Sequence, residues 1–393
     1  MTAPRPLLQA FSRAYPGHSP DVIVQAPGQV NLLGGHVDMH DGYVITTAIN
    51  RVIWLAAAFG SADYVRLHAA DMDQAATVSL KRLENHADIV GNGLPHWAQY
   101  PAGVAWALQQ RGLKVNGMDA AFLGDVPMGA GLSSSAAVEM AFAVAWQAFE
   151  SWRIELKELA QAGREAERGY LRLEAGIQGQ FTCLHAREGQ ALWLDCRTLE
   201  YKHLPFPYQA RVVVCDTNSR RELAVGSTYN NRAEDCHSTA HTISLVDRHV
   251  QRLRDVSLER LLDFESVLTE DQFRRSHHVI TEMARVQKGA EALQNGDAAA
   301  FGQLMNESYR SAKDDYGSSS PALDTMWQAA TRHPGCYGAR YSGSGGGGAI
   351  IALVEAAAVD DFVKQTGTCY ERMTAKTGLF FPVEPAPSAG VVI

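Results

Sequence analysis

The sequence predicts an α+β protein with two domains. Its 393 residues exceed the length of one typical domain, and 46% of them are hydrophobic, which is enough for substantial cores. Strand-like and helix-like stretches follow one another without the strict strand–helix–strand alternation of a doubly wound sheet. We place the domain boundary at the Pro-containing loop of residues 204–207, which gives an N-terminal domain of residues 1–205 and a C-terminal domain of residues 206–393.

The N-terminal half mixes apolar runs of strand length with longer helix-like stretches. We expect strands at residues 44–48, 52–58 and 191–196. We expect helices at residues 97–111, 138–149 and 156–170. Because residues 138–146 contain neither Gly nor Pro and are mainly apolar, the helix that they begin is expected to be mostly buried.

The C-terminal half is rich in helices. A buried strand is expected at residues 210–216, and helices at residues 229–250, 257–267, 276–295 and 299–315. The glycine-rich segment of residues 342–348 then leads into a strand at residues 349–354. A run of glycines usually forms a flexible turn, and close approach of the backbone to a ligand is the alternative.

A loop of small residues precedes the buried helix of the N-terminal half. Residues 127–136 contain two glycines, Gly129 and Gly131, and three consecutive serines. Serine is favourable at a helix N-terminus, and glycine lets backbone N–H groups approach a bound anion. These amides and the positive end of the helix dipole would form a cradle for phosphate. The alternative is an ordinary glycine turn capped by serine. The segment is not a P-loop, because Gly-Lys-Ser/Thr does not follow.

The composition argues against several kinds of partner. A net charge of -8 disfavours nucleic acid and anionic membranes. No run of about 18 apolar residues occurs, and residues 1–6 lack the apolar core of a signal peptide. The six cysteines form no CxxC pair, so we expect neither structural zinc nor disulfides. We therefore expect a cytoplasmic protein.

Five segments, taken together and in this order, resemble those of galactokinases within the GHMP small-molecule kinase superfamily. They are residues 26–38, 129–136, 176–180, 216–224 and 338–343. One such motif would be weak evidence, but five in series span nearly the whole chain.

The resemblance implies a two-domain α+β kinase in which ATP and a sugar meet in the cleft between the domains. The phosphate loop of the family matches Gly129, Ala130, Gly131, Leu132, Ser133, Ser134 and Ser135. The family's Mg²⁺-binding serine and glutamate match Ser135 and Glu167, and Glu167 has the family's spacing to Gly179. Without the resemblance, Glu167 reads as a solvated carboxylate on a helix. The segment at 342–348 matches a loop that packs against the nucleotide loop and the substrate.

Four positions depart from the galactokinase pattern. The family has Arg at Gln29, Glu at Gly35, Tyr at Met39 and Asp at Gly179. The Asp orients or deprotonates the attacking hydroxyl, and the Arg steadies that Asp and the phosphoryl group. Glycine has no proton acceptor, and glutamine carries no charge. Because both partners are replaced, no guanidinium is left unpaired, and the site is expected to have been re-tuned as a unit.

On the sugar side, His36, Asp38, Gly176 and Tyr229 match the family's sugar contacts. The glutamate that Gly35 replaces meets the far hydroxyl end of the sugar, so we expect Gly35 to open room for a bulkier, modified or acidic sugar. Two functions remain open. The first is an ATP- and Mg²⁺-dependent monomeric kinase that phosphorylates the anomeric hydroxyl of galactose or a related sugar without the Asp base. The second is a catalytically silent sensor that binds nucleotide and sugar.

Overall fold

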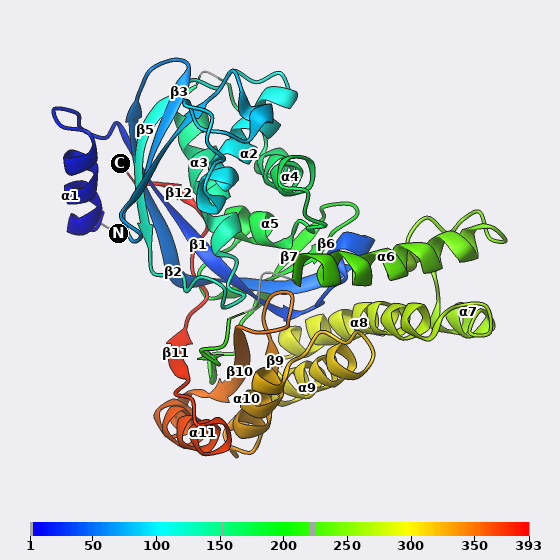
Figure 1. The fold of residues 1–393 in the computed structure, drawn as a ribbon. Helices are drawn as coiled ribbons and strands as arrows, with labels where there is room; N and C mark the ends of the chain where they lie inside the picture. Colours follow the sequence, from blue (N-terminus) through cyan, green and yellow to red (C-terminus); the bar gives the residue numbers. More distant parts are fainter. Residues whose placement is uncertain (1–2, 151, 221–224, 393) are drawn as a thin grey trace.

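The computed structural model describes residues 3–150, 152–220 and 225–392, with the side chains of these residues other than 225–229. Within this part of the chain, eight strands form a larger sheet and four strands form a smaller one, and helices cover both (Figure 1). The mixed architecture confirms the predicted α+β class. No helix in the described segments is both long and apolar enough to cross a bilayer.

The antiparallel strands β1 (Val22–Leu33) and β2 (Tyr43–Phe59) form the centre of the larger sheet. The strand order is β12-β1-β2-β5-β3-β4, with β6 paired to β2 and β7 paired to β6. The outer strands are β3 (Tyr64–Ala69), β4 (Gln74–Ser79), β5 (Met118–Gly124), β6 (Gln190–Asp195), β7 (Tyr201–Pro205) and β12 (Gly390–Val391). Through β12, the end of the chain returns to the first sheet.

The two strands predicted at residues 44–48 and 52–58 are one continuous strand, β2. The exposed polar Asn50 separates the two apolar runs, but β1 pairs with β2 on both sides of it. Between the pairs Pro27–Val52 and Gln29–Ala48, one residue of β1 lies opposite three residues of β2, so β2 carries the irregularity and continues through it. A loop was predicted at residues 204–207, but Leu204 and Pro205 are the last two residues of β7, so the observed loop begins at residue 206.

Helices pack on both faces of the larger sheet. Helix α1 (Arg5–Ala14) covers one face. The helices on the other side are α2 (His96–Gln110), α3 (Ser134–Phe149), α4 (Leu156–Glu165) and α5 (Gln178–His185). The helix predicted at 156–170 is α4 followed by a π-helical turn, Ala166–Tyr170, which contains Glu167. Such turns interrupt a helix and frequently occur at functional sites.

The smaller sheet has the order β11-β8-β10-β9 and is antiparallel throughout. Its strands are β8 (Ala210–Asp216), β9 (Cys336–Tyr341), β10 (Ala349–Glu355) and β11 (Leu379–Val383). The surrounding helices are α6 (Val225–Ser244), α7 (Leu258–Asp263), α8 (Glu270–Gln294), α9 (Ala298–Asp314), α10 (Pro321–Thr331) and α11 (Val359–Thr374). Helices α10 and α11 were not among the predicted elements.

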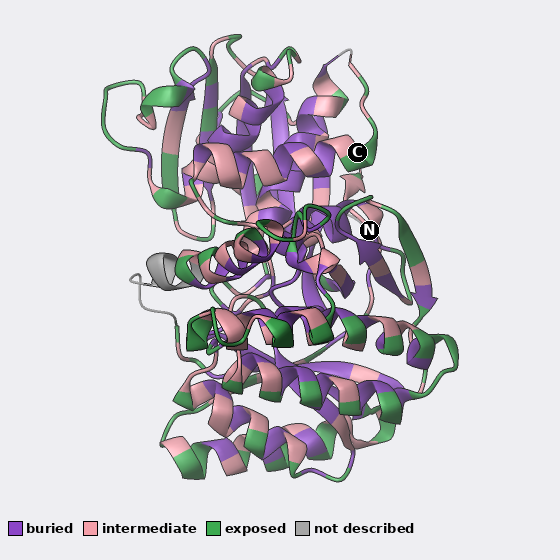
Figure 2. Ribbon diagram, turned by 90° about the vertical axis from the view of Figure 1, so that its right-hand side faces the viewer, coloured by how far each residue is buried: buried purple, intermediate pink, exposed green. Residues whose placement is uncertain are grey.

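One cluster of buried side chains extends from the larger sheet through α8 and α9 to the smaller sheet (Figure 2). Residues Val212 and Val214 of β8 face this cluster, whereas Val213 and Cys215 face a second cluster beneath α10 and α11. Helix α8 approaches β1 very closely, because a Cβ added to Gly289 would lie 2.4 Å from Leu33 Cδ1. The two halves are therefore joined by a continuous core and not only by a linker.

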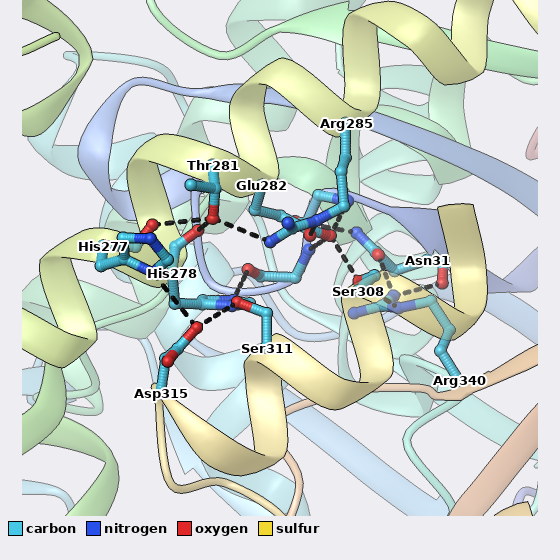
Figure 3. Close-up of polar contacts among 12 residues, drawn as sticks. Asn31, His277, His278, Thr281, Glu282, Arg285, Ser308, Ser311, Asp315 and Arg340 are labelled. Carbon is cyan, nitrogen blue, oxygen red and sulfur yellow. Dashed lines mark hydrogen bonds and ion pairs between the residues drawn. The ribbon is translucent and has the colours of Figure 1, made fainter. Parts of the chain in front are cut away.

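A buried carboxylate on α8 holds the turn that follows β1 (Figure 3). Glu282 Oε1 accepts the N–H of Gly34 at 2.8 Å and the N–H of Gly35 at 3.2 Å. The same oxygen accepts the Ser308 hydroxyl at 2.6 Å, and Oε2 accepts Arg285 Nε at 2.6 Å. This one side chain thus connects α8, α9 and the end of β1.

The surroundings of Glu282 keep it ionised. Burial alone would raise its pKa, but the charges of Arg285, His278 and Arg340 and the Ser308 hydroxyl hold the pKa of Glu282 well below its ordinary value. The folded state therefore gains stability from this group at every pH above the ordinary glutamate pKa of 4.5, and it loses that stability as the pH falls below it.

We predict that Glu282→Gln lowers the free energy of unfolding at pH 7 by about 3 kcal/mol, because the guanidinium of Arg285 loses its buried counter-charge. Urea unfolding measures the change. The matched control is Glu291→Gln, an exposed residue of the same helix, which should change stability by no more than about 0.5 kcal/mol. The difference between Glu282→Gln and the unaltered protein should shrink below pH 4.5; a difference that grows there would contradict the assignment.

Candidate active site

A cavity of about 310 Å³ lies where β1, the phosphate loop, the π-helical turn, α5 and α6 meet. This volume is at the lower end of the range for small-molecule sites. Its lining residues are Gln29, Asn31, Gly35, His36, Asp38, Tyr100, Ser133, Ser135, Ala136, Glu167, Leu173, Ala175, Gly176, Gln178, Gly179, Gln180, Asn230, Gly343 and Ser344. The structure therefore brings most of the predicted site residues to one cavity. Tyr229 lies in α6, but its side chain is outside the described residues.

The phosphate loop is bent by residues in the left-handed region. Gly129, Gly131 and Ser133 have φ of 70°, 81° and 56° respectively, and α3 begins at Ser134. The expected serine cap is absent, since Ser133 makes no side-chain capping bond to the helix. Its Oγ instead accepts a hydrogen bond from Gln29 Nε2 at 2.7 Å. The first amides of α3 are therefore not blocked by the side chain of Ser133.

The glycine-rich loop packs directly on the phosphate loop. Ser342 Oγ donates to Gly131 O at 2.7 Å, and Ala349 N donates to Ala130 O at 3.1 Å. A Cβ added to Gly131 would lie 2.2 Å from Ser342 O, so no side chain fits at this position. Gly343 and Ser344 continue from this contact to the cavity wall. The packing against the nucleotide loop expected from the resemblance is thus present.

Two carboxylates and one hydroxyl lie at the phosphate-loop end of the cavity. Gln180 Nε2 donates to Glu139 Oε2 at 2.8 Å and to Glu167 Oε2 at 3.0 Å, so the two carboxylates share one amide. Burial raises the pKa of Glu167 to about 7, although hydrogen bonds from Gln180 and Ser135 act to lower it. Burial and the charge of Glu167 also raise the pKa of Glu139 well above its ordinary value. Glu167 is therefore a cavity residue and not a solvated helix carboxylate.

This donor set suits Mg²⁺ bound together with phosphates. Within the described residues, no three His, Cys, Asp or Glu side chains form a group that would hold a metal by themselves. Ser135 and Glu167 would supply one hydroxyl and one carboxylate oxygen, and Mg²⁺ usually takes its remaining ligands from phosphate and water. A divalent cation here would also relieve the crowding of two buried carboxylates.

Asp38 and Gly176 form one side of the end of the cavity next to the turn that follows β1, and, in addition to burial, the charge of Asp38 raises the pKa of Glu167. A Cβ added to Gly176 would lie 1.7 Å from Asp38 Oδ2, so only glycine lets this carboxylate take its place. Burial raises the pKa of Asp38, while N–H groups of Gln178 and Met39 and the charge of Arg168 oppose the rise. The carboxylate faces the cavity and can accept hydroxyl protons from a ligand.

His36 forms the other side of this end. It has a φ of 63°, stacks on Tyr316 with ring centroids 4.3 Å apart, and places Nε2 2.9 Å from the Tyr341 hydroxyl. Burial, followed by the charges of His278, Arg232 and Arg340, lowers the pKa of His36 well below its ordinary value. The imidazole is therefore neutral at pH 7 and acts through hydrogen bonds rather than charge.

Gln29 and Gly179 lie together beside the phosphate loop. Gln29 is bound through Nε2 to Ser133, and its Oε1 has no hydrogen-bond partner in the described structure. Gly179 is the second residue of α5, and a Cβ added there would lie 3.0 Å from Ala136 Cβ and 3.7 Å from Ser133 Oγ. A side chain at position 179 would thus point at the serine that Gln29 holds.

The expectation that Gly35 opens room in the cavity is wrong. A Cβ added to Gly35 would lie 2.2 Å from Arg340 Nη2, so the guanidinium of Arg340 already fills the space beside the glycine. Arg340 belongs to β9 and is 1% exposed. It reaches this position by donating from Nη1 to Asn31 O at 2.7 Å.

Several cavity and near-cavity residues were missed by the sequence reasoning. They are Asn31, Glu139, Gln178, Gln180, Asn230, Glu282 and Arg340. A signal existed for Glu139, because it is the one charged residue in the apolar stretch 138–146. Gln178 and Gln180 flank Gly179 and lay inside a matched segment, whereas no local pattern marks Glu282.

Three family models match the chain. The GHMP kinases N terminal domain matches residues 99–187, the GHMP kinases C terminal model matches residues 290–368, and the galactokinase galactose-binding signature matches residues 9–59. These matches cover the phosphate loop, the π-helical turn and the Gly34–His36 turn.

The chain is similar to galactokinases over its whole length. It is 37% identical to the galactokinase of Roseiflexus sp. (strain RS-1), over 98% of this chain and 97% of the relative. It is 38% identical to the galactokinase of Chloroflexus aurantiacus, over 91% of this chain and 90% of the relative.

Solved structures show the same relationship. The crystal structure of Lactococcus lactis galactokinase complexed with galactose superposes with a TM-score of 0.90 at 27% identity, over 98% of both chains. Methanococcus jannaschii mevalonate kinase, with a TM-score of 0.62 at 15% identity over 95% of this chain and 100% of that one, shares the fold. The two-domain GHMP kinase architecture predicted from the sequence is confirmed, and the chain belongs to the galactokinase family of GHMP kinases.

Proposed function

We propose that this protein is an ATP- and Mg²⁺-dependent sugar kinase that phosphorylates the anomeric hydroxyl of galactose or a related sugar without a carboxylate base. One observation supports this most directly. A single cavity brings the phosphate loop and the Ser135–Glu167 pair together with Asp38, Gly176 and His36. A nucleotide phosphate and a polyhydroxylated ligand would meet between these two groups.

The triphosphate end would be held by backbone amides and by the metal. The N-terminus of α3 and the left-handed residues of the loop direct N–H groups and positive dipole charge toward a phosphate. Mg²⁺ held by Ser135 and Glu167 would neutralise the charge of the phosphates. The glycine-rich loop fixes the phosphate loop from behind through Ser342.

The sugar would be held by hydrogen bonds with Asp38 and His36. Asp38 would accept protons from ring hydroxyls, and Gly176 keeps it in place. Neutral His36 would offer one further contact, and its ring is held by Tyr316 and Tyr341. These residues orient the anomeric hydroxyl, which is the main task in phosphoryl transfer.

Transfer at this site would proceed without a side-chain base. The bond between the anomeric oxygen and the γ-phosphorus forms as the bond between that phosphorus and the ADP oxygen breaks, and the hydroxyl proton passes to an oxygen of the transferred phosphoryl group. The loose transition state of such reactions depends chiefly on positioning and electrostatics. A general base typically contributes about 10²–10⁴-fold, so a slower kinase remains chemically competent.

A second function is favoured by the residues at positions 29 and 179. Gln29 is bound to Ser133, and Gly179 has no side chain, so neither can move a proton. A protein that binds nucleotide and sugar and transfers nothing would have the same cavity. The two functions are separated by a coupled assay of ADP release over a panel of sugars, combined with calorimetry for ATP and for each sugar. Sugar-dependent ADP release supports the kinase, and binding of both ligands without ADP release supports the sensor.

We predict that Gly179→Asp combined with Gln29→Arg raises kcat by at least about tenfold, because it supplies both a proton acceptor and a charge that steadies it. The increase in kcat from the double change should exceed the product of the increases from the two single changes. The control is Gly179→Asn with Gln29→Arg, which has nearly the same shape but no acid. Steady-state kinetics decide the outcome, and additive effects of the two single changes would count against their coupling.

We predict that Glu167→Gln weakens the binding of Mg²⁺–ATP by roughly 10- to 100-fold, the equivalent of losing one contact to a charged group. Thermal stability should not fall, because the change removes one of two crowded carboxylates. Calorimetry with and without Mg²⁺ tests this, with the exposed Glu188→Gln as control. Equal loss of affinity for ATP in EDTA would show that Glu167 does not act through the metal.

A further inference from the structure

Two buried guanidinium groups lie behind the cavity wall near Gly35 and His36, and neither has a carboxylate in an ion pair among the residues that the structure describes. Arg340 of β9 is 1% exposed and Arg232 of α6 is 9% exposed. Neither forms an ion pair with any residue that the structure describes, whereas the partly buried Arg285 and Arg254 each pair with a carboxylate, Glu282 and Asp195 respectively. A buried charge without a partner is strongly unfavourable unless a ligand supplies one.

Two of the three guanidinium nitrogens of Arg340 donate hydrogen bonds to the protein. Its Nη1 donates to Asn31 O and to Asn31 Oδ1, and its Nε donates to Ser308 Oγ at 3.2 Å (Figure 3). Nη2 has no hydrogen-bond partner within the described residues. That nitrogen lies where a side chain at Gly35 would begin, and Gly35 lines the cavity. The unused N–H groups are therefore next to the sugar end.

Arg232, which belongs to helix α6, likewise has one nitrogen that is hydrogen-bonded and one that has no partner among the described residues. Its Nη2 donates to Gly317 O at 2.5 Å, whereas its Nε finds no partner in the described part of the molecule. Its positive charge acts on both His36 and Tyr341, as does the charge of Arg340. The two guanidinium groups thus lie near the same wall of the cavity.

The carboxylate whose charge is felt by Arg340 already accepts hydrogen bonds from other groups. Glu282 is the acidic group whose charge affects Arg340, and it binds Arg285, Ser308 and two backbone amides. Ser308 lies between Glu282 and Arg340 as a shared hydroxyl. This wall therefore carries more buried positive charge than Glu282 balances.

We propose that the sugar bound here is a hexuronic acid, whose carboxylate at the carbon farthest from the anomeric centre is bound by Arg340 Nη2 with help from Arg232. The proposal rests on the proposed function, since it takes the anomeric carbon to lie at the phosphate-loop end. In galactokinases the residue at position 35 is a glutamate that meets the far end of the sugar. In this protein the negative charge would come from the ligand instead of from residue 35.

A carboxylate suits this position better than other anionic groups. The planar guanidinium matches the planar carboxylate in shape and hydrogen-bond geometry. Oxidising the terminal hydroxymethyl group to a carboxylate adds only one heavy atom, whereas a phosphate ester adds four. The cavity of 310 Å³ must also admit the end of the triphosphate, so the smaller anion is favoured.

Calorimetry of the full-length protein with single sugars tests the ligand. The probes are galacturonate, glucuronate, galactose, N-acetylgalactosamine and galactose 6-phosphate. One of the two hexuronates should bind at least about 30-fold more tightly than galactose, because a buried charged pair is lost with the neutral sugar. Tightest binding of galactose, N-acetylgalactosamine or galactose 6-phosphate would overturn the proposal.

Substitutions at Gly35 and Arg340 test the contact. Both Gly35→Glu and Gly35→Gln must displace the end of the Arg340 side chain, since its Nη2 lies 2.2 Å from the position of the new Cβ. Gly35→Glu also supplies a carboxylate that pairs with the displaced guanidinium and should reverse the preference in favour of galactose. Gly35→Gln, equal in size but uncharged, should weaken both sugars to a similar extent. Arg340→Gln should remove the preference for hexuronate, and Arg232→Gln should reduce it. Because Arg340 is deeply buried, Arg340→Gln is expected to lower stability as well, so the Gly35 pair decides the result. Equal ratios of hexuronate to galactose affinity in Gly35→Glu and Gly35→Gln would refute the proposed contact.

The same sugars in the ADP-release assay separate this proposal from the proposed function. Tight hexuronate binding without ADP release supports the anionic subsite and rejects the kinase. Phosphorylation of galactose with no hexuronate preference supports the kinase and rejects the subsite.

Discussion

The carboxylate of Glu282 is the interaction on which the sugar end of the site depends. It lies beneath the Gly34–Gly35 turn and binds both amides, while Arg285 and Ser308 hold it from α8 and α9. Through Ser308 it also fixes Arg340, whose other contacts reach back to Asn31 on β1. Because these groups are buried, apart from the partly buried Arg285, their hydrogen bonds are stronger than in water, and an unpaired member would be strongly destabilising. The turn that carries His36 and Asp38 is thus set by residues of the C-terminal half.

Two carboxylates lie near one part of the cavity and two guanidinium groups lie near another, so ligands of opposite charge would stabilise the two parts. At the phosphate-loop end, Glu139 and Glu167 share one amide and have raised pKa values, so a cation would stabilise them. Near Gly35 and His36, Arg340 and Arg232 each have one nitrogen without a hydrogen-bond partner among the described residues, so an anion there would stabilise them. A Mg²⁺–nucleotide and an acidic sugar would satisfy both ends at once. Buried polar groups without partners point to ligands, and here they lie on both sides of one cavity.

Three of the residues that distinguish this chain from the galactokinase pattern contact, or lie close to, side chains from other segments. Gln29 reaches Ser133 and ties the phosphate loop to β1. Gly35 leaves a space that Arg340 fills, and any larger residue there must displace its guanidinium. Gly179 faces the same serine that Gln29 binds. The replacements at positions 29 and 35 are therefore in direct contact with residues of other segments, Ser133 and Arg340.

The sequence by itself determined the fold class, the family, the phosphate loop and the buried helix behind it, because these are written in local patterns of glycine, serine and apolar residues. It also identified most cavity residues, since their motifs are contiguous. Only the tertiary structure showed that β2 is one strand, that Ser133 does not cap α3, and that Arg340 fills the space beside Gly35. Gly34 and Glu282 are 248 positions apart, and no local pattern encodes such a contact. Side chains from distant segments decide where charge is left unpaired, so the sequence suggested an acidic sugar as one option at Gly35 but could not identify Arg340 and Arg232 as the groups that would bind it.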